Sequence, residues 1–364
     1  MRRTYSLKVC PFCATRYFSD DRLCSTDESN SISKLSDDVL LEIFDHYRKD
    51  HYNNPRPLLV WKWHILAHVC KRWRQLVFSS PRRLDLQILC TFGTPFREDL
   101  GIWPALPIVL DLYSPGFPFT PNDEDNAIAA LEHSDRLCSI SLYVTGSMWA
   151  KMPTVLRKPF PLLKRFKFVT VGLNVPALPD EFLGGSAPCL QEFYLSSIPF
   201  PALPTLLLTT SNLVNLTLST MPRTGYIPPE TMVACLDVLP LLERFVIEFS
   251  ERDPHPDQIR PPPTTRSVLP ALTSFAFRGP FQYLEDFVTQ IDGPQLDEIV
   301  LRYLDVFRVV QLSEFINRSV GPELTPPGRA HVICLRDAVV FTVYRRANYP
   351  GLDQRPLRLP SLMT

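Results

Sequence analysis

A short apolar motif recurs seven times between residues 137 and 301, and it constrains the fold more than any other feature of the chain. In each copy an apolar residue is followed by two others, a second apolar residue, one other and a third apolar residue. The copies are Leu137/Ile140/Leu142, Leu163/Phe166/Phe168, Leu190/Phe193/Leu195, Leu213/Leu216/Leu218, Leu242/Phe245/Ile247, Leu272/Phe275/Phe277 and Leu296/Ile299/Leu301. Successive copies lie 23 to 30 residues apart. A unit this small must stack on its neighbours to bury its apolar side.

This pattern resembles the leucine-rich repeat, although the Asn or Cys that regular copies place after the motif is missing. The resemblance implies an α/β fold: a small all-α N-terminal region, then an irregular solenoid whose strands form a curved parallel sheet. We expect helices over residues 124–133, 230–239 and 281–291. We expect opening strands around Leu84/Leu86/Ile88 and Ile108/Leu110/Leu112, and closing strands over 331–335 and 339–344. The alternative is a non-repetitive α/β domain in which the matches arise by chance.

The residues between the apolar positions of each motif share the other, concave face of the predicted sheet, because side chains alternate across a strand. Charged, amide and aromatic groups are mixed there, which favours a protein target over a nucleic acid. The alternative is an ordinary solvated sheet face. The candidate target-binding residues are Lys167, Tyr194, Asn215, Arg244, Glu248, Arg278 and Arg302.

Residues 35–84 predict two short amphipathic helices joined by a polar loop over 48–57. Ser36 is a helix-capping residue, and the acidic residues after it suit the first turn of a helix. The first apolar stripe is Val39, Leu40, Ile43, Phe44 and Tyr47. The second helix is expected from Val60 to Val77, with Ile65, Leu66, Val69, Cys70, Trp73, Leu76 and Val77 on its apolar face. Each large apolar residue contributes about 1.5–3 kcal/mol when fully buried, so this pair requires a partner surface.

The order of residues in this segment resembles the F-box, and in detail the F-box of fungal proteins. The matching stretches are Leu35-x-Asp-Asp-Val-Leu-Leu-Glu-Ile-Phe44, Val69-Cys-Lys-Arg-Trp-Arg74 and Pro81-Arg-Arg-Leu84. Ser36 replaces the usual Pro, and the connection between the halves is longer than usual. The resemblance implies docking on the Skp-type adaptor of a cullin–RING (SCF) ubiquitin ligase. The residues it implies for that contact are Leu35, Val39, Leu40, Ile43, Phe44, Val69, Cys70 and Trp73.

The two resemblances together imply a non-catalytic ligase subunit that presents a protein target for ubiquitin-dependent degradation, with no cofactor of its own. The alternative is a non-ligase leucine-rich-repeat scaffold whose two helices dock on its own array. The domains are then a flexible N-terminal segment, the F-box, the irregular array with a Pro-rich loop from Asp253 to Pro263, and a loose C-terminal tail. Their boundaries are 1–30, 31–84, 85–346 and 347–364.

Composition excludes several other classes of function. The 38 basic residues balance 38 acidic ones, so charge favours neither nucleic acid nor an anionic membrane. No apolar run is long enough to span a bilayer. The nine cysteines are scattered, which indicates a reducing compartment, the cytoplasm or the nucleus.

Two groups of residues with metal-binding character are weak candidates. Cys10, Cys13 and Cys24 lack the second ligand pair of a structural zinc site. His64 and His68 lack the Glu that a metalloprotease motif places after its first His. We therefore expect no metal site.

Overall fold

The protein is described here by a computed structural model, and it folds into two compact units. The first comprises residues 1–143 and 147–163, and the second residues 144–146 and 164–364. The described residues are 6–9, 16–19, 31–52, 63–94, 96–101, 104–114, 119–170, 175–250, 266–303, 310–320, 329–334 and 339–344. The predicted loop from Asp253 to Pro263 and the predicted tail over 347–364 lie outside them. No helix in the described ranges combines the length and apolar character that crossing a membrane requires.

The first unit contains the predicted helical segment. A 3₁₀ turn (Ser31–Lys34) precedes α1 (Asp37–Tyr52), and α2 (Trp63–Val69) and α3 (Lys71–Ser79) follow. Ser36 caps α1 as predicted, because its Oγ accepts a hydrogen bond from the Val39 N–H at 3.4 Å. Helix α1 runs past the predicted loop start at residue 48, since no helix breaker occurs before Pro55.

The prediction of one continuous second helix from Val60 to Val77 is wrong. Cys70 has an extended backbone, with φ −158° and ψ 172°, and separates α2 from α3. Its Sγ accepts a hydrogen bond from the Trp73 N–H at 3.5 Å, so it caps α3. The apolar periodicity continues through this break, which is why the sequence pattern did not reveal it. In the predicted flexible segment, β1 (Ser6–Val9) pairs antiparallel with β2 (Arg16–Ser19).

Three parallel strands complete the first unit, in the order β3 (Ile88–Thr91), β4 (Ile108–Leu112) and β5 (Leu137–Val144). The first opening strand begins at Ile88; Leu84 and Leu86 precede it as buried residues. Three helices accompany these strands: α4 (Phe96–Leu100), α5 (Pro121–Glu132) and α6 (Gly146–Lys151). Helix α5 starts three residues before the predicted Glu124, because Thr120 and Asp123 form a capping box there.

The second unit is built from parallel strands in sequence order, as the repeated motif predicts. They are β6 (Arg165–Thr170), β7 (Glu192–Ser196), β8 (Asn215–Met221), β9 (Arg244–Phe249), β11 (Ser274–Gly279) and β13 (Glu298–Tyr303). Together with β3 to β5, these make nine parallel strands in the described ranges, apart from one small separate pair. The α/β class is thereby confirmed, and the order of strands is compatible with a solenoid of stacked repeats. A small parallel pair joins β10 (Ser267–Val268) to β12 (Ile291–Asp292).

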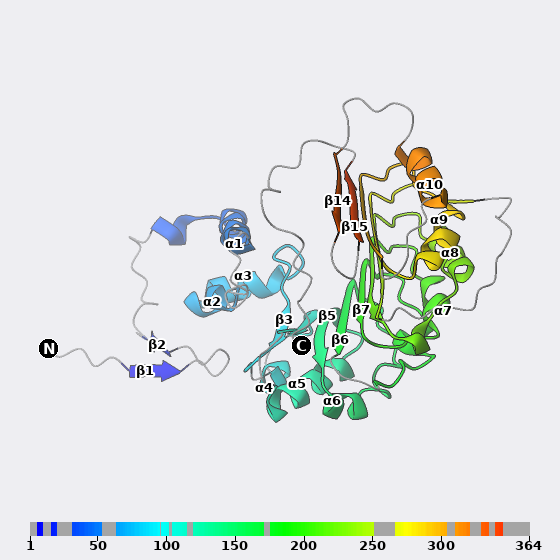
Figure 1. The fold of residues 1–364 in the computed structure, drawn as a ribbon. Helices are drawn as coiled ribbons and strands as arrows, with labels where there is room; N and C mark the ends of the chain where they lie inside the picture. Colours follow the sequence, from blue (N-terminus) through cyan, green and yellow to red (C-terminus); the bar gives the residue numbers. More distant parts are fainter. Residues whose placement is uncertain are drawn as a thin grey trace. The chain divides into compact units, whose positions relative to one another are not determined.

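The predicted closing strands form an antiparallel hairpin. β15 (Val339–Tyr344) pairs antiparallel with β13, and β14 (Arg329–Cys334) pairs antiparallel with β15. The helices of this unit, from the green α7 to the orange α10, lie on one side of its sheet (Figure 1). They are the 3₁₀ helices Phe182–Gly185 and Arg223–Gly225, α7 (Leu203–Leu207), α8 (Pro229–Asp237), α9 (Phe281–Val288) and α10 (Val310–Val320). Helix α9 ends before the predicted Ile291, because Ile291 belongs to β12.

One tight turn precedes the strands of successive repeats. The first leucine of the motif donates its N–H to the carbonyl three residues earlier, for example Leu163 to Phe160 and Leu242 to Leu239. Proline is favoured at the second position of such a turn, because its ring fixes φ near the value that the turn requires. It occupies that position in five of the turns, as Pro161, Pro188, Pro240, Pro270 and Pro294.

The apolar residues of each motif form the core between the sheet and the helices of the second unit. Phe166 stacks on Phe193 with ring centroids 5.4 Å apart, and Phe245 stacks on Phe275 at 5.8 Å. These rings are equivalent residues of neighbouring repeats, paired in register across the strands. The apolar residues that repeat along the sequence thus pack against one another across neighbouring strands, as a row of buried aromatic and aliphatic side chains.

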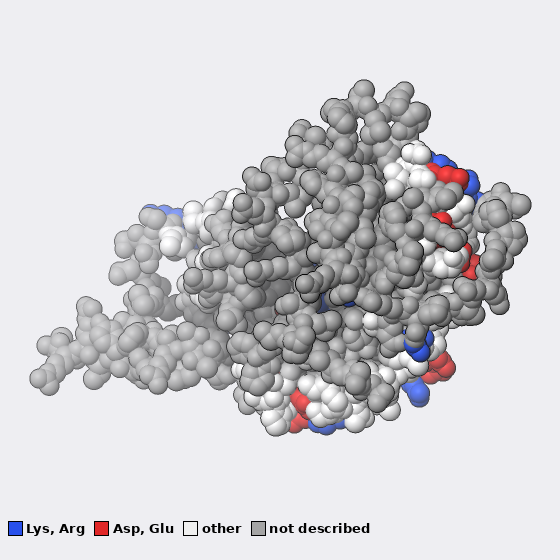
Figure 2. All heavy atoms as spheres, viewed as in Figure 1, with Lys and Arg blue, Asp and Glu red and all other residues white. Residues whose placement is uncertain are grey.

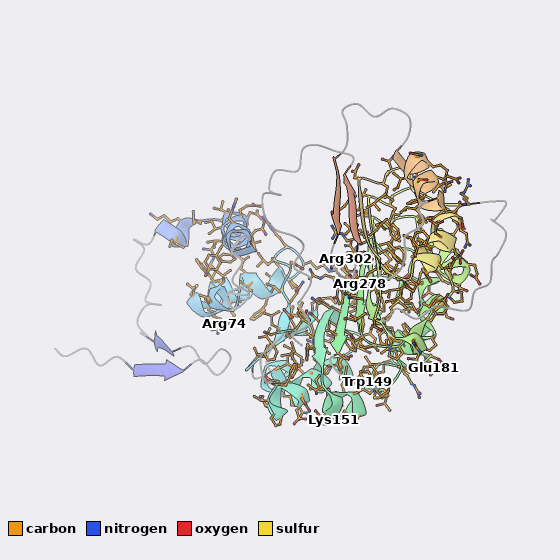
Figure 3. All side chains as sticks on the ribbon, in the orientation of Figure 1. Arg74, Trp149, Lys151, Glu181, Arg278 and Arg302 are labelled. Carbon is orange, nitrogen blue, oxygen red and sulfur yellow. The ribbon has the colours of Figure 1, made fainter. Side chains whose placement is uncertain are left out.

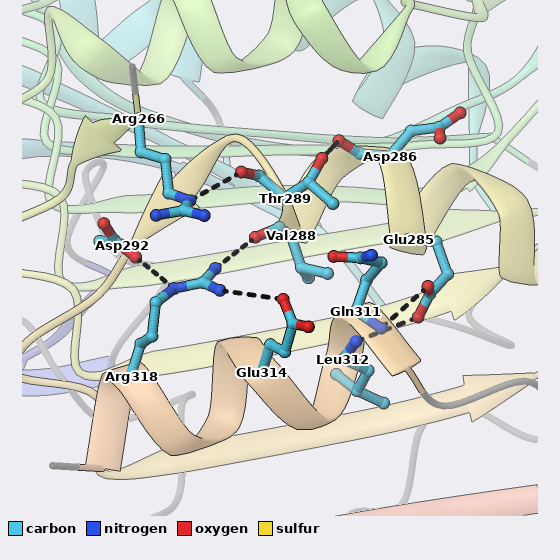
Figure 4. Close-up of polar contacts among 10 residues, drawn as sticks. All are labelled: Arg266, Glu285, Asp286, Val288, Thr289, Asp292, Gln311, Leu312, Glu314 and Arg318. Carbon is cyan, nitrogen blue, oxygen red and sulfur yellow. Dashed lines mark hydrogen bonds and ion pairs between the residues drawn. The ribbon is translucent and has the colours of Figure 1, made fainter. Parts of the chain in front are cut away.

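Polar contacts fasten α10 to the preceding repeat (Figure 4). The Glu285 carboxylate accepts hydrogen bonds from the N–H groups of Gln311 and Leu312, at 3.2 and 3.1 Å, and so caps the start of α10. Near the other end, the Arg318 guanidinium binds the Asp292 carboxylate at 2.9 Å and the Val288 carbonyl at 3.2 Å. Burial raises the pKa of Glu285, while the two backbone hydrogen bonds oppose that rise.

Candidate functional site

The helical segment has a small core of its own. Leu40 and Phe44 of α1 are fully buried, and the Phe44 ring lies 4.7 Å from the Trp73 ring of α3, measured between centroids. Arg72 of α3 fixes the start of α1, because its guanidinium binds the Asp37 carboxylate at 2.7 Å. The same guanidinium donates to the carbonyl of Leu35 at 2.6 Å. The three helices are therefore held in a defined arrangement.

A second set of contacts ties the helices together at their edges. Arg74 of α3, labelled in Figure 3, donates from Nε to the Ala67 carbonyl of α2 at 2.9 Å. Arg83 binds the carboxylate of Glu42 on α1 and lies 3.6 Å from that of Asp38. These ion pairs are largely exposed, so they orient the helices more than they stabilise the fold.

Large apolar side chains on the same helices remain open to solvent. On α1, Val39 and Ile43 are 44% and 45% exposed, and on α2, Ile65 and Val69 are 43% and 54% exposed. Each pair is spaced i, i+4, so each forms a short stripe along its helix. Because α1 contacts both α2 and α3, the stripes belong to one helical body. We call these four residues the apolar stripes.

The structure places the predicted adaptor-binding residues in three environments. Val39, Ile43 and Val69 are exposed, whereas Leu40 and Phe44 are buried in the helical core. Leu35, Cys70 and Trp73 are half-buried. Leu40 and Phe44 therefore support the surface from below instead of forming it.

Ile65 belongs to the exposed surface but is absent from the predicted contact set. Its position four residues before Val69 on α2 was the signal that could have found it. Ile32, at the preceding 3₁₀ turn, is 54% exposed and adds another apolar group near the start of α1.

The second candidate surface is the face of the second unit's sheet that none of its described helices covers (Figure 1), and we call it the helix-free face. Strand pairing sorts its predicted residues into lateral rows. One row pairs Lys167 with Tyr194, and their Nζ and ring centroid are 5.0 Å apart. Another row pairs Asn215 with Arg244. The face therefore carries charged and polar residues, in contrast to the apolar face beneath the helices.

Two rows of this face carry carboxylates, the row of Arg244 and the row of Glu248. Ser274 donates to the Glu298 carboxylate at 2.9 Å, in the row of Arg244. Ser219 donates to the Glu248 carboxylate at 2.5 Å, and Glu248 is buried. Ser274 and Ser219 are polar residues of this face that were missing from the predicted set. Strand alternation could have identified both.

Arg278 and Arg302 continue the row of Glu248. The register pairs Glu248 with Arg278 and Arg278 with Arg302. Figure 3 shows both arginines on the side of the sheet away from the helices. The structure thus brings all seven predicted target-binding residues onto one face of the second unit's sheet.

Charges of both signs are mixed on the described part of the surface that Figure 2 draws. On the face drawn in Figure 2, described basic and acidic side chains lie next to one another instead of forming separate patches. Within the described ranges, no three His, Cys, Asp or Glu residues are placed to hold a metal ion. Cys10, Cys13 and Cys24 lie outside those ranges, so the structure does not place them.

Comparison with known proteins adds no assignment. Neither the models of known protein families nor the curated proteins contain a match to this sequence. The function must therefore be inferred from the two surfaces themselves.

Proposed function

We propose that the protein is the substrate-recognition adaptor of an SCF ubiquitin ligase. In this function residues 31–84 act as an F-box that docks on the Skp-type adaptor and, through it, on the cullin. The array, of the leucine-rich type, binds a protein target. The observation that carries the proposal is the exposure of the apolar stripes on helices that already have a core of their own.

Exposed isoleucine and valine side chains in regular pairs favour a docking surface. Single apolar residues are common on protein surfaces, but clustered ones mark sites that another molecule covers. The helical core of Leu40, Phe44 and Trp73 holds the stripes in place, so little ordering is required on binding. Covering the stripes removes apolar surface from water, which is the main favourable term in association.

The proposed mechanism is approximation. The helical segment holds the ligase, the sheet face holds the target, and lysines of the target stay close to the loaded ubiquitin-transfer enzyme. The raised local concentration promotes transfer, and the protein itself forms and breaks no bond. It performs this function in the cytoplasm, the nucleus or both.

The test is capture of a purified Skp-type adaptor by the full-length protein. We expect the wild type to retain the adaptor and Ile43→Asp and Val69→Asp to weaken binding at least about tenfold, because each places a charge in the apolar contact. Leu40→Asp is unsuitable as the main variant, since Leu40 is buried and its replacement disrupts the helical core.

Leu241→Asp is the matched control. Leu241 is 49% exposed, close to the exposure of the stripe residues, but it lies in the turn before β9. This variant should retain the adaptor fully. If the wild type does not bind, or if all three variants lose binding equally, the protein is not an adaptor of this kind and the scaffold alternative is favoured.

A further inference from the structure

The most informative feature outside the helical segment is the pair Arg278 and Arg302. The two residues are partners in the register of β11 and β13, so they are lateral neighbours. Both alternate with buried residues, Phe277 and Leu301, and so project from the helix-free face. Two cations are thereby held side by side on rigid, paired strands.

These arginines have no partner among the residues that the structure describes. The Arg302 Nε is buried and forms no hydrogen bond with any of them. Arg278 and Arg302 also form no ion pair with a described residue, although Glu248 is the lateral neighbour of Arg278. A buried donor without an acceptor destabilises the fold, and native proteins rarely retain one without a function. Within the described residues, the guanidinium groups of the pair therefore have no acceptor.

The local charge indicates the kind of acceptor. Glu248 lies beside Arg278 in this row and accepts a hydrogen bond from Ser219. Two guanidinium groups and one carboxylate leave one net positive charge, which matches a single negative charge. A guanidinium presents its N–H groups in a planar fork that pairs with both oxygens of a carboxylate. The carboxylate of Glu248 repels a doubly charged group more strongly than a singly charged one.

We propose that Arg278 and Arg302 bind a carboxylate of the protein target, from an Asp or Glu residue or from the target's C-terminus. This inference rests on the proposed function, because it assigns the chemistry by which the sheet face recognises its target. The two arginines fix the position of the carboxylate, and the neighbouring rows of the face contact the residues around it.

The test uses the full-length protein and a synthetic random peptide library with free C-termini. We expect the selected peptides to carry Asp or Glu, or to require the terminal carboxylate. Replacing the acidic residue by its amide, in one arm, and amidating the C-terminus, in the other, then identifies the source of the carboxylate. The Arg278→Gln/Arg302→Gln double variant should bind the selected peptides at least about tenfold more weakly.

Arg157→Gln is the control, because it makes the same kind of charge change at an exposed residue of the first unit. It should bind the peptides as the wild type does. Thermal unfolding checks that the double variant is folded, and its unfolding temperature should equal or exceed that of the wild type, since an unsatisfied donor has been removed.

Three outcomes overturn the inference: no selected peptides, peptides whose binding ignores both arginines, or a requirement for a phosphate group. Capture of the Skp-type adaptor by the same protein, measured in parallel, tests the proposed function separately. If the adaptor binds while the peptides ignore the arginines, only the carboxylate site is wrong.

Discussion

The helical segment and the strand array treat their apolar residues in opposite ways. In the array, the strands that carry the repeated motif bury its apolar residues beneath helices, and their other face carries charged and polar residues together with valines such as Val246. In the helical segment, Leu40 and Phe44 are buried, while Val39 and Ile43 on the same helix are open. Repeats can cover one another indefinitely, but three short helices cannot cover all of their apolar surface. A group of helices this small is therefore expected to leave apolar surface exposed, and a partner protein can cover that surface.

The largest expected effect is on the free energy of unfolding, and it tests how closely the core of the array is packed. Phe245 is fully buried and stacks on Phe275, so Phe245→Ala should lower the free energy of unfolding by about 3–5 kcal/mol. Urea denaturation measures this. Leu241→Ala, at an exposed position of the same repeat, should cost no more than about 0.5 kcal/mol. Similar losses for the two variants would contradict the sealed core.

The next prediction compares a buried and an exposed residue of the helical segment. Leu40→Ala should cost about 2–5 kcal/mol, because Leu40 is fully buried. Ile43→Ala truncates a side chain of the same volume, but Ile43 is 45% exposed. This substitution should therefore lower the free energy of unfolding by less than about 1 kcal/mol. Both values come from denaturation of the full-length protein. If Ile43→Ala is as costly as Leu40→Ala, the protein itself covers the stripes and the contrast between the regions disappears.

Polar contacts in the first unit should have a smaller effect. Asp123 closes the capping box of α5 and accepts a hydrogen bond from the Gly93 N–H at 3.0 Å. Asp123→Ala should therefore cost about 0.5–2 kcal/mol in thermal or chemical unfolding. Loss of α5 alone, without a change in overall stability, would show that this cap acts only locally.

The same carboxylate should make stability depend on pH. Burial alone would raise the pKa of Asp123, but hydrogen bonds from Gly93 and Thr120 outweigh it and lower the pKa below its ordinary value of 3.8. The folded state therefore favours the ionised form. Its contribution is fully present above that ordinary value and is lost as pH falls below it, through the lower folded pKa. Stability curves of wild type and Asp123→Asn should converge in that acidic range.

The smallest effect concerns the aromatic core of the array and has the opposite sign. The Tyr283 hydroxyl is buried without a hydrogen-bond partner among the described residues, and burial raises its pKa well above the ordinary value. Tyr283→Phe keeps the ring contacts with Phe249 and removes the unsatisfied group. It should raise the free energy of unfolding by about 1 kcal/mol. A loss of stability would mean that the hydroxyl is satisfied in solution.

Periodicity predicted the elements of the array well, because each motif fixes which face of a strand is buried. The candidate target-binding face follows from the same alternation, and its residues fall in register. The buried residues of the helical segment were harder to predict, since the apolar stripe of each helix includes more residues than the small core buries. Spacing alone could not show that Leu40 faces the core and Val39 the solvent. The break at Cys70 was also hidden, because the apolar period continues through it.

The lack of ion-pair partners for Arg278 and Arg302 within the described part of the protein could not be predicted either. Sequence placed them on one face, but their lateral neighbours depend on strand register. Glu248 is the lateral neighbour of Arg278 in the strand register but forms no ion pair with it, and only the side-chain positions reveal that.

The antiparallel hairpin has a consequence for how such a fold grows. The strands β6, β7, β8, β9, β11 and β13 pair parallel in that order, but β15 runs antiparallel to β13 and ends that sequence. Because β15 lies between β13 and β14, a unit appended after it would have to pair with β14, the outermost described strand. The hairpin therefore keeps any strand added at this end of the sheet from pairing with β13, the last parallel strand of the array.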